Sequence, residues 1–266
     1  MLHKYSKMSA IIFRYKKKQS ICIDYQVLFE ELRDLCFPAF KYKQGNCHNI
    51  VHYCSMILNQ RGIKHKKIWF YAPVRFISGS KECIVRPDPN HLSISGNLKW
   101  GYHVALLFED GRNCQVFDWM IQETQPMNIN DWVMCMGLKN YKIDIVASEN
   151  YLFYENPEKV KNNAIRYFKY EDKCRDHYWI AKGMAINETA YEFYQTEGHL
   201  RETHPKDFKL LVGSIINFEC IIRDNQSNSR INDSFREKHA LIIQKYRNIY
   251  FKNLNKWIDK IEIFDI

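Results

Sequence analysis

Three residues of the types that perform nucleophilic catalysis occur in well-defined segments of this chain. Cys47 lies in QGNCHNIVHYCSMILNQRG (44–62), His103 lies in GYHVALLF and Asp118 ends NCQVFD. A thiolate is the nucleophile of cysteine enzymes, and a nearby imidazole can act as its general base and acid. A carboxylate beside the imidazole would hold the ring and stabilise its charge. The set therefore predicts covalent catalysis by the Cys47 thiol.

The residues around Cys47 predict a helix that begins at the thiol. Apolar side chains follow it at offsets of 3, 4, 7, 10 and 11, the buried stripe of a helix. Asn46 suits the N-cap and Gly62 suits the terminator. The helix dipole would favour a thiolate here, and the unpaired N–H groups of the first turn could bind an oxyanion, with Gln44 as a possible extra donor. In the alternative reading, Cys47 is a packed core residue, as most free cysteines are.

A hairpin would bring the other two residues together. Asp-Gly between two strand-like runs is a strong hairpin signal, and we take Asp110 and Gly111 as the central residues of the turn. His103 then pairs directly with Asp118, which puts their Cβ atoms about 5 Å apart. A bulge or a longer turn would shift this register.

The composition of the 266 residues, 46% hydrophobic and 15% aromatic, predicts a globular protein, and the expected helices and strands predict an α+β fold. We expect an N-terminal domain at 1–150, with a Cys-bearing helix packed on an antiparallel sheet, and a mostly helical region at 151–266. The expected elements are helices at 28–35 and 47–61, a strand at 66–72, a long loop at 78–99, hairpin strands at 101–108 and 113–119, and helices at 156–170, 174–195, 206–223 and 234–260.

The charge and cysteine content restrict the classes of partner and compartment. The net charge of +9 is concentrated in the first half, but no nucleic-acid-binding motif accompanies it, so we expect no nucleic-acid partner. Nine cysteines without a close pair favour reduced thiols in a cytosol-like compartment. No run approaches the ~20 apolar residues of a membrane helix, and the N-terminus lacks the apolar stretch of a secretory signal.

Three patches of the sequence resemble the bacterial protein glutaminases, or protein glutamine deamidases. The first is Cys47 with His52, Ile57, Leu58 and Gly62; the second is the run Trp100-Gly101-Tyr102-His103-Val104-Ala105; the third is Asp118 at the end of the next strand. The resemblance covers roughly residues 40–135. Trp119 stands where that family often has proline, which bears on the rim of the site.

The resemblance implies a papain-like, transglutaminase-like core with a Cys-His-Asp site. Such a site hydrolyses the side-chain amide of a protein-bound glutamine through a thioester, releases ammonia and needs no cofactor. Similar deamidases occur among effectors that bacteria deliver into host cells, so a host protein is the expected substrate. The region 151–266 has no counterpart there and is expected to be either a structural lobe or a substrate-recognition lobe.

Other functions fit the same residues. The same three residue types form the active sites of cysteine proteases, isopeptidases and transglutaminases. Alternatively, the core could be an inert binding module. His48 and His52 have the spacing of a zinc-binding helix, but Asn49 replaces the catalytic glutamate, so we expect no metal and read His52 as packing or as a neighbour supporting the site. The sequence does not indicate an oligomeric state.

Overall fold

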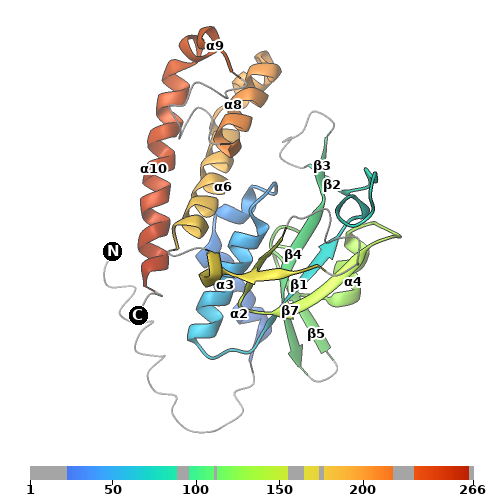
Figure 1. The fold of residues 1–266 in the computed structure, drawn as a ribbon. Coiled ribbons are helices and arrows are strands. Elements are labelled where there is room, and N and C mark those ends of the chain that lie inside the picture. Colours follow the sequence, from blue (N-terminus) through green and yellow to red (C-terminus); the bar gives the residue numbers. More distant parts are fainter. Residues whose placement is uncertain are drawn as a thin grey trace.

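The computed structural model describes residues 23–88, 96–110, 113–154, 165–173, 177–217 and 231–263. Its centre is a five-stranded antiparallel sheet in the order β6-β5-β4-β1-β7, and two further strand pairs, β2-β3 and β8-β9, lie outside it (Figure 1). The strands are β1 (Lys66–Tyr71), β2 (Ile84–Pro87), β3 (Asn97–Trp100), β4 (Tyr102–Asp110), β5 (Asn113–Phe117), β6 (Met127–Asn128), β7 (Lys142–Ala147), β8 (Asn150–Phe153) and β9 (Tyr167–Lys169).

Some helices lie against the sheet, and others form a second stack that extends away from it (Figure 1). They are α2 (Tyr25–Cys36), α3 (Cys47–Gln60), α4 (Ile129–Cys135), α5 (Tyr170–Lys173), α6 (Tyr178–Thr196), α7 (Gly198–Thr203), α8 (Pro205–Asn217), α9 (Asp233–Lys238) and α10 (Ala240–Glu262), with short 3-10 turns at Ala39–Lys41 and Pro73–Arg75. The predicted combination of helices with an antiparallel sheet is confirmed. No helix in the described ranges is long and apolar enough to cross a membrane.

The central sheet is buried on both faces because alternate residues of its strands enter two hydrophobic clusters. Val104 and Leu106 of β4 belong to the cluster that contains α2, α3 and α6. Ala105 and Leu107 belong to the second cluster, which includes Trp132 of α4. The period-2 alternation of a strand thus distributes one apolar run between two layers.

Helix α3 begins at Cys47, as predicted, and its C-terminal end follows from a glycine. Gly62 has φ +68°, its N–H donates to the Asn59 carbonyl, and the Ile63 N–H donates to the Leu58 carbonyl at 2.9 Å. This is the Schellman arrangement, in which a left-handed residue lets the chain satisfy the last helical carbonyls. The N-cap is unusual, since Asn46 adopts φ +57° and its side chain makes no capping hydrogen bond.

The helical region shares a core with the sheet layer. α6 packs against α3 and against α10, and Met184 and Phe193 of α6 lie in the same buried cluster as Cys54 and Leu58 of α3.

The mostly helical character beyond residue 150 is confirmed. The helix expected at 234–260, however, is two helices, α9 and α10, that meet at His239. Residues 218–223 of the helix expected at 206–223 lie outside the described residues. The division into domains at residue 150 stays a prediction.

Two other predicted segments differ from the structure. The expected loop at 78–99 contains the paired strands β2 and β3, and its residues 89–95 lie outside the described residues. The helix expected at 156–170 is wrong at its end, where Tyr167–Lys169 form β9 paired with β8; residues 155–164 lie outside the described residues. In both cases strand pairing satisfies backbone groups that local sequence left unassigned.

The hairpin of β4 and β5 forms, but with a different register from the predicted one. Asp110 pairs with Asn113 and Leu106 pairs with Phe117, so the predicted direct pairing of His103 with Asp118 is wrong by two residues. Asp110, a predicted central residue of the turn, is instead the last ladder residue of β4, so the pairing is displaced along β5. Residues 111–112 lie outside the described residues.

Candidate active site

The structure brings together the three residues with predicted catalytic chemistry. Cys47 is the first residue of α3, His103 is the second residue of β4 and Asp118 directly follows β5. His103 Nε2 lies 2.7 Å from Asp118 Oδ2, and the Cys47 side chain adjoins the same ring and raises its pKa. Since Asp118 occupies Nε2, Nδ1 is the ring nitrogen left for Cys47. A thiol, an imidazole and a carboxylate therefore lie in series, and the imidazole and the carboxylate are hydrogen-bonded.

This series is shielded from water and electrostatically polarised. The exposed fractions of Cys47, His103 and Asp118 are 8%, 2% and 5%. Burial alone would lower the pKa of His103, but the charge and hydrogen bond of Asp118, together with Cys47, outweigh burial and raise this pKa to about 10. At neutral pH the ring is therefore an imidazolium, and it lies beside the Cys47 side chain.

The carboxylate of Asp118 is held by two further donors. The Trp132 indole N–H of α4 donates to Asp118 Oδ2 at 2.7 Å, and the Met120 backbone N–H donates to Oδ1 at 3.1 Å. On the other side, the Trp100 ring stacks on the His103 ring, with centroids 4.7 Å apart and planes at 17°. The hydrogen bond to Asp118 therefore restrains the His103 ring within its own plane, and the Trp100 ring packs against one face of it.

Sequence reasoning missed the bond from Trp132 to Asp118. Trp132 is fully buried, and buried indoles usually find a hydrogen-bond acceptor. That rule was the only available signal, and it does not identify the acceptor. Trp100 belonged to the family-like run around His103, although its stacking was not predicted.

The three residues given supporting roles lie in different environments. Trp119 is buried and lines a small cavity of about 10 Å³ together with Cys47, and its indole N–H donates to the Phe29 carbonyl. Gln44 is exposed and lies three residues before the thiol. His52 is buried, and its ring contacts the rings of Tyr151 and Tyr170. The contribution of these three residues to a reaction stays a prediction.

His52 also forms a buried pair with Lys67. The Lys67 ammonium nitrogen lies 2.6 Å from His52 Nδ1 and donates to the Asn150 carbonyl at 2.7 Å. Burial, with the neighbouring positive charge of Lys67, lowers the pKa of His52, and burial lowers that of Lys67. Within the ranges that the structure describes, no group of three or more His, Cys, Asp or Glu side chains has a metal-binding arrangement.

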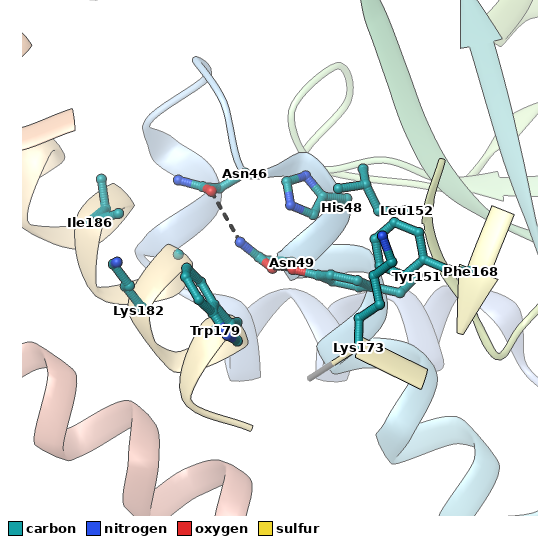
Figure 2. A pocket seen from close by; sticks show the side chains of 11 residues that line it. Asn46, His48, Asn49, Tyr151, Leu152, Phe168, Lys173, Trp179, Lys182 and Ile186 are labelled. Atoms are coloured by element: carbon teal, nitrogen blue, oxygen red, sulfur yellow. Dashed lines mark hydrogen bonds between the residues drawn. The ribbon is translucent and has the colours of Figure 1, made fainter. Parts of the chain in front are cut away.

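A pocket of about 430 Å³ lies beside the start of α3 (Figure 2). Aromatic rings of Tyr151, Phe168 and Trp179 form much of its lining, and the side chains of Lys173 and Lys182 come from either side of it. Asn46, His48 and Asn49 contribute to the same lining, whereas Cys47 does not. The pocket therefore adjoins the nucleophile turn without containing the thiol.

Comparison with known proteins gives one family match. A family model described as "Glutaminase" matches residues 25–136, a segment that contains Cys47, His103, Asp118 and Trp132. No curated protein matches the sequence.

Solved structures give distant likenesses. The NMR structure of protein-glutaminase from Chryseobacterium proteolyticum is 15% identical with a TM-score of 0.40, covering 62% of this chain and 83% of that one. A crystal structure of protein-glutaminase is 14% identical with a TM-score of 0.41, covering 62% and 84%, and one of pro-protein-glutaminase is 13% identical with a TM-score of 0.40, covering 74% and 68%. Similarities this low add no weight to the assignment, which rests on the family model. Residues 25–136 of the chain match the glutaminase family model.

Proposed function

We propose that this protein hydrolyses the side-chain amide of glutamine in a protein substrate, with Cys47 as nucleophile, His103 as general base and acid, and Asp118 as the group that orients the ring. The observation that carries the proposal is the hydrogen-bonded His103–Asp118 pair with Cys47 beside the imidazole, inside the segment that matches the glutaminase family model.

In the first half of the reaction, the Cys47 thiolate attacks the carboxamide carbon and forms a C–S bond. The oxyanion that develops would be bound by backbone N–H groups at the start of α3, which have no intrahelical partner. The imidazolium of His103 then gives its proton to the nitrogen, the C–N bond breaks and ammonia leaves a thioester on Cys47.

In the second half, His103 accepts a proton from water, and the resulting hydroxide attacks the thioester carbon. The C–S bond breaks, the side chain leaves as a carboxylic acid that loses its proton to solvent to become glutamate, and the thiolate and imidazolium are restored. Asp118 keeps its charge throughout, because its role is to stabilise the protonated ring. All atoms are accounted for without a metal or an organic cofactor.

The proposal extends to a host-cell protein as substrate and to a reducing compartment as the place of action. The six described cysteines Cys36, Cys47, Cys54, Cys83, Cys114 and Cys135 are free thiols, which suits such a compartment. The bacterial effectors that the sequence resembles act on proteins of their hosts, which supports the same extension.

The test measures ammonia release from a panel of folded proteins and glutamine peptides, with intact mass used to detect conversion of amide to acid. Cys47→Ala is compared with wild type, and Cys83→Ala is the matched control because Cys83 is a partly exposed thiol outside the site. We expect conversion in wild type and in Cys83→Ala but none in Cys47→Ala.

Other products would overturn the proposal in specific ways. Peptide fragments would indicate a protease, and incorporation of an added amine at glutamine in preference to water would indicate a transglutaminase. Full conversion by Cys47→Ala would remove Cys47 from the mechanism. Absence of any product, combined with a Cys47 thiol that alkylates no faster than Cys83, would indicate an inert binding module.

A further inference from the structure

The two residues before Cys47 both adopt left-handed backbone conformations. Gly45 has φ +77° and Asn46 has φ +57°, and Asn46 is the one described non-glycine residue with positive φ. Asparagine tolerates this region better than most residues, but the conformation persists only where surrounding contacts favour it. Because this turn leads directly into Cys47, whatever holds it also sets the position of the thiol and of the first helical N–H groups.

A series of side-chain amides holds the turn. The Asn46 amide does not cap its own helix; its Nδ2 donates to Asn187 Oδ1 at 3.1 Å and its Oδ1 accepts from Asn49 Nδ2 at 3.0 Å (Figure 2 shows the latter bond). Asn49 Oδ1 accepts from the Tyr151 hydroxyl at 2.5 Å. Asn187 Nδ2 also lies 3.5 Å from the Gly45 carbonyl oxygen. The turn is therefore fixed through both its side chain and its backbone.

The outer end of this series comes from α6, in the helical region. Asn187 is fully buried, so its amide is committed to these partners. One turn earlier, Gly183 lets α6 approach the same amides: a Cβ at this position would lie 1.9 Å from Asn49 Nδ2 and 3.1 Å from Asn46 Oδ1. Both residues lie beyond the segment that matches the family model, which ends at residue 136.

We propose that Asn187 is a positioning residue for the reaction: through Asn46 it holds the turn that aims Cys47 at His103, with Gly183 providing the space for this contact. The proposal rests on the proposed function in taking Cys47 as the nucleophile. Helix α6 is then part of the apparatus that prepares the thiol, in addition to any role in stability or in substrate recognition. Loss of the Asn187 amide would let Asn46 relax and displace the thiol relative to the imidazolium.

The first test compares Asn187→Leu with Asn253→Leu. Asn253 is also buried and donates to Thr189 of α6 at 3.1 Å, so its removal breaks a similar amide bond of the same helix away from the turn. For each variant, the rate of Cys47 alkylation by iodoacetamide is measured against pH by peptide mass spectrometry, along with kcat, KM and Tm. We expect Asn187→Leu to lower the alkylation rate and kcat by about tenfold or more with KM little changed, and Asn253→Leu to affect only Tm.

A second pair of variants tests the same contact in case Asn187→Leu does not fold. Gly183→Ala should lower the alkylation rate of Cys47 in the same way, whereas Gly213→Ala, on α8 with no atom within 4 Å of the added Cβ, should not. Equal alkylation rates in Asn187→Leu and wild type, or equal losses in the test and control variants, would overturn the positioning role. If wild type releases no ammonia while Cys47 reactivity still depends on Asn187, the deamidase assignment fails and the positioning role stands.

Discussion

Replacing Asp118 with asparagine is the most direct perturbation of the charge distribution in the site. The carboxylate accepts three hydrogen bonds, from the His103 ring, the Trp132 indole and the Met120 backbone. An asparagine has one oxygen and one NH₂ group, so in either orientation its NH₂ faces at least one of these donors. The substitution therefore removes the negative charge beside His103 and leaves a buried donor unpaired, which costs about 1–3 kcal/mol.

The size of the effect on the thiol follows from the pKa of His103. Asp118 and Cys47 raise it to about 10 against the opposing effect of burial, and the difference from the ordinary value of about 6.5 corresponds to about 5 kcal/mol in favour of the imidazolium. Packing against Trp100 still holds the ring in the variant, and Cys47 still contacts it. Because Asp118 supplies the two largest raising effects and burial remains, we expect more than half of this free energy to be lost, equivalent to about a hundredfold fall or more in Cys47 alkylation at neutral pH.

The assay is the rate of iodoacetamide alkylation at Cys47 as a function of pH, with Tm recorded for each variant. Asp144→Asn is the matched control, since Asp144 is a strand carboxylate that accepts from the Tyr167 hydroxyl at 2.9 Å and lies outside the site. Asp118→Asn should move the rise in alkylation rate to higher pH, and Asp144→Asn should leave it in place. An unchanged profile in a folded Asp118→Asn protein would refute the view that Asp118 maintains the imidazolium.

Three further predictions concern single positions. Trp132→Phe removes the indole donor and should lower kcat less than Asp118→Asn does, because the carboxylate keeps its charge and two other donors; an equal loss would contradict this order. Burial and the charge of Lys67 lower the pKa of His48 to about 4. Between pH 6.5 and 4, the unfolded chain therefore binds a proton at this residue that the folded chain does not. The free energy of unfolding should fall by up to about 3 kcal/mol on acidification through this range. His48→Phe should flatten this part of the Tm-against-pH curve, and parallel curves would exclude His48 as its cause. Gly62→Ala should destabilise the protein by about 1 kcal/mol in urea unfolding because of its φ of +68°, whereas the helical Gly213→Ala should be neutral or stabilising.

The sequence was informative where a local rule determines the structure. The helix from Cys47 was predictable because its apolar period, a preceding Asn and a following Gly all agree, and β1 followed from a run of aromatic and β-branched residues. The strand β9 was not predictable, since its existence depends on a partner, β8, and no local signal outweighed the helical spacing around it. The bonds from Trp132 to Asp118 and from Asn187 to Asn46 join positions far apart in the chain, and no periodicity encodes them.

The contact between His103 and Asp118 formed although the predicted register was wrong, and the reason lies in the period of a strand. Side chains alternate between faces every residue, so a register error of two residues leaves every side chain on its predicted face. His103 and Asp118 thereby become diagonal rather than directly opposed positions, a separation that an imidazole and a carboxylate can still span. An error of one residue would have placed Asp118 on the opposite face of the hairpin from the imidazole. The prediction of the site therefore depended on the parity of the register, which the alternating apolar residues of β4 and β5 determine, and not on the length of the turn.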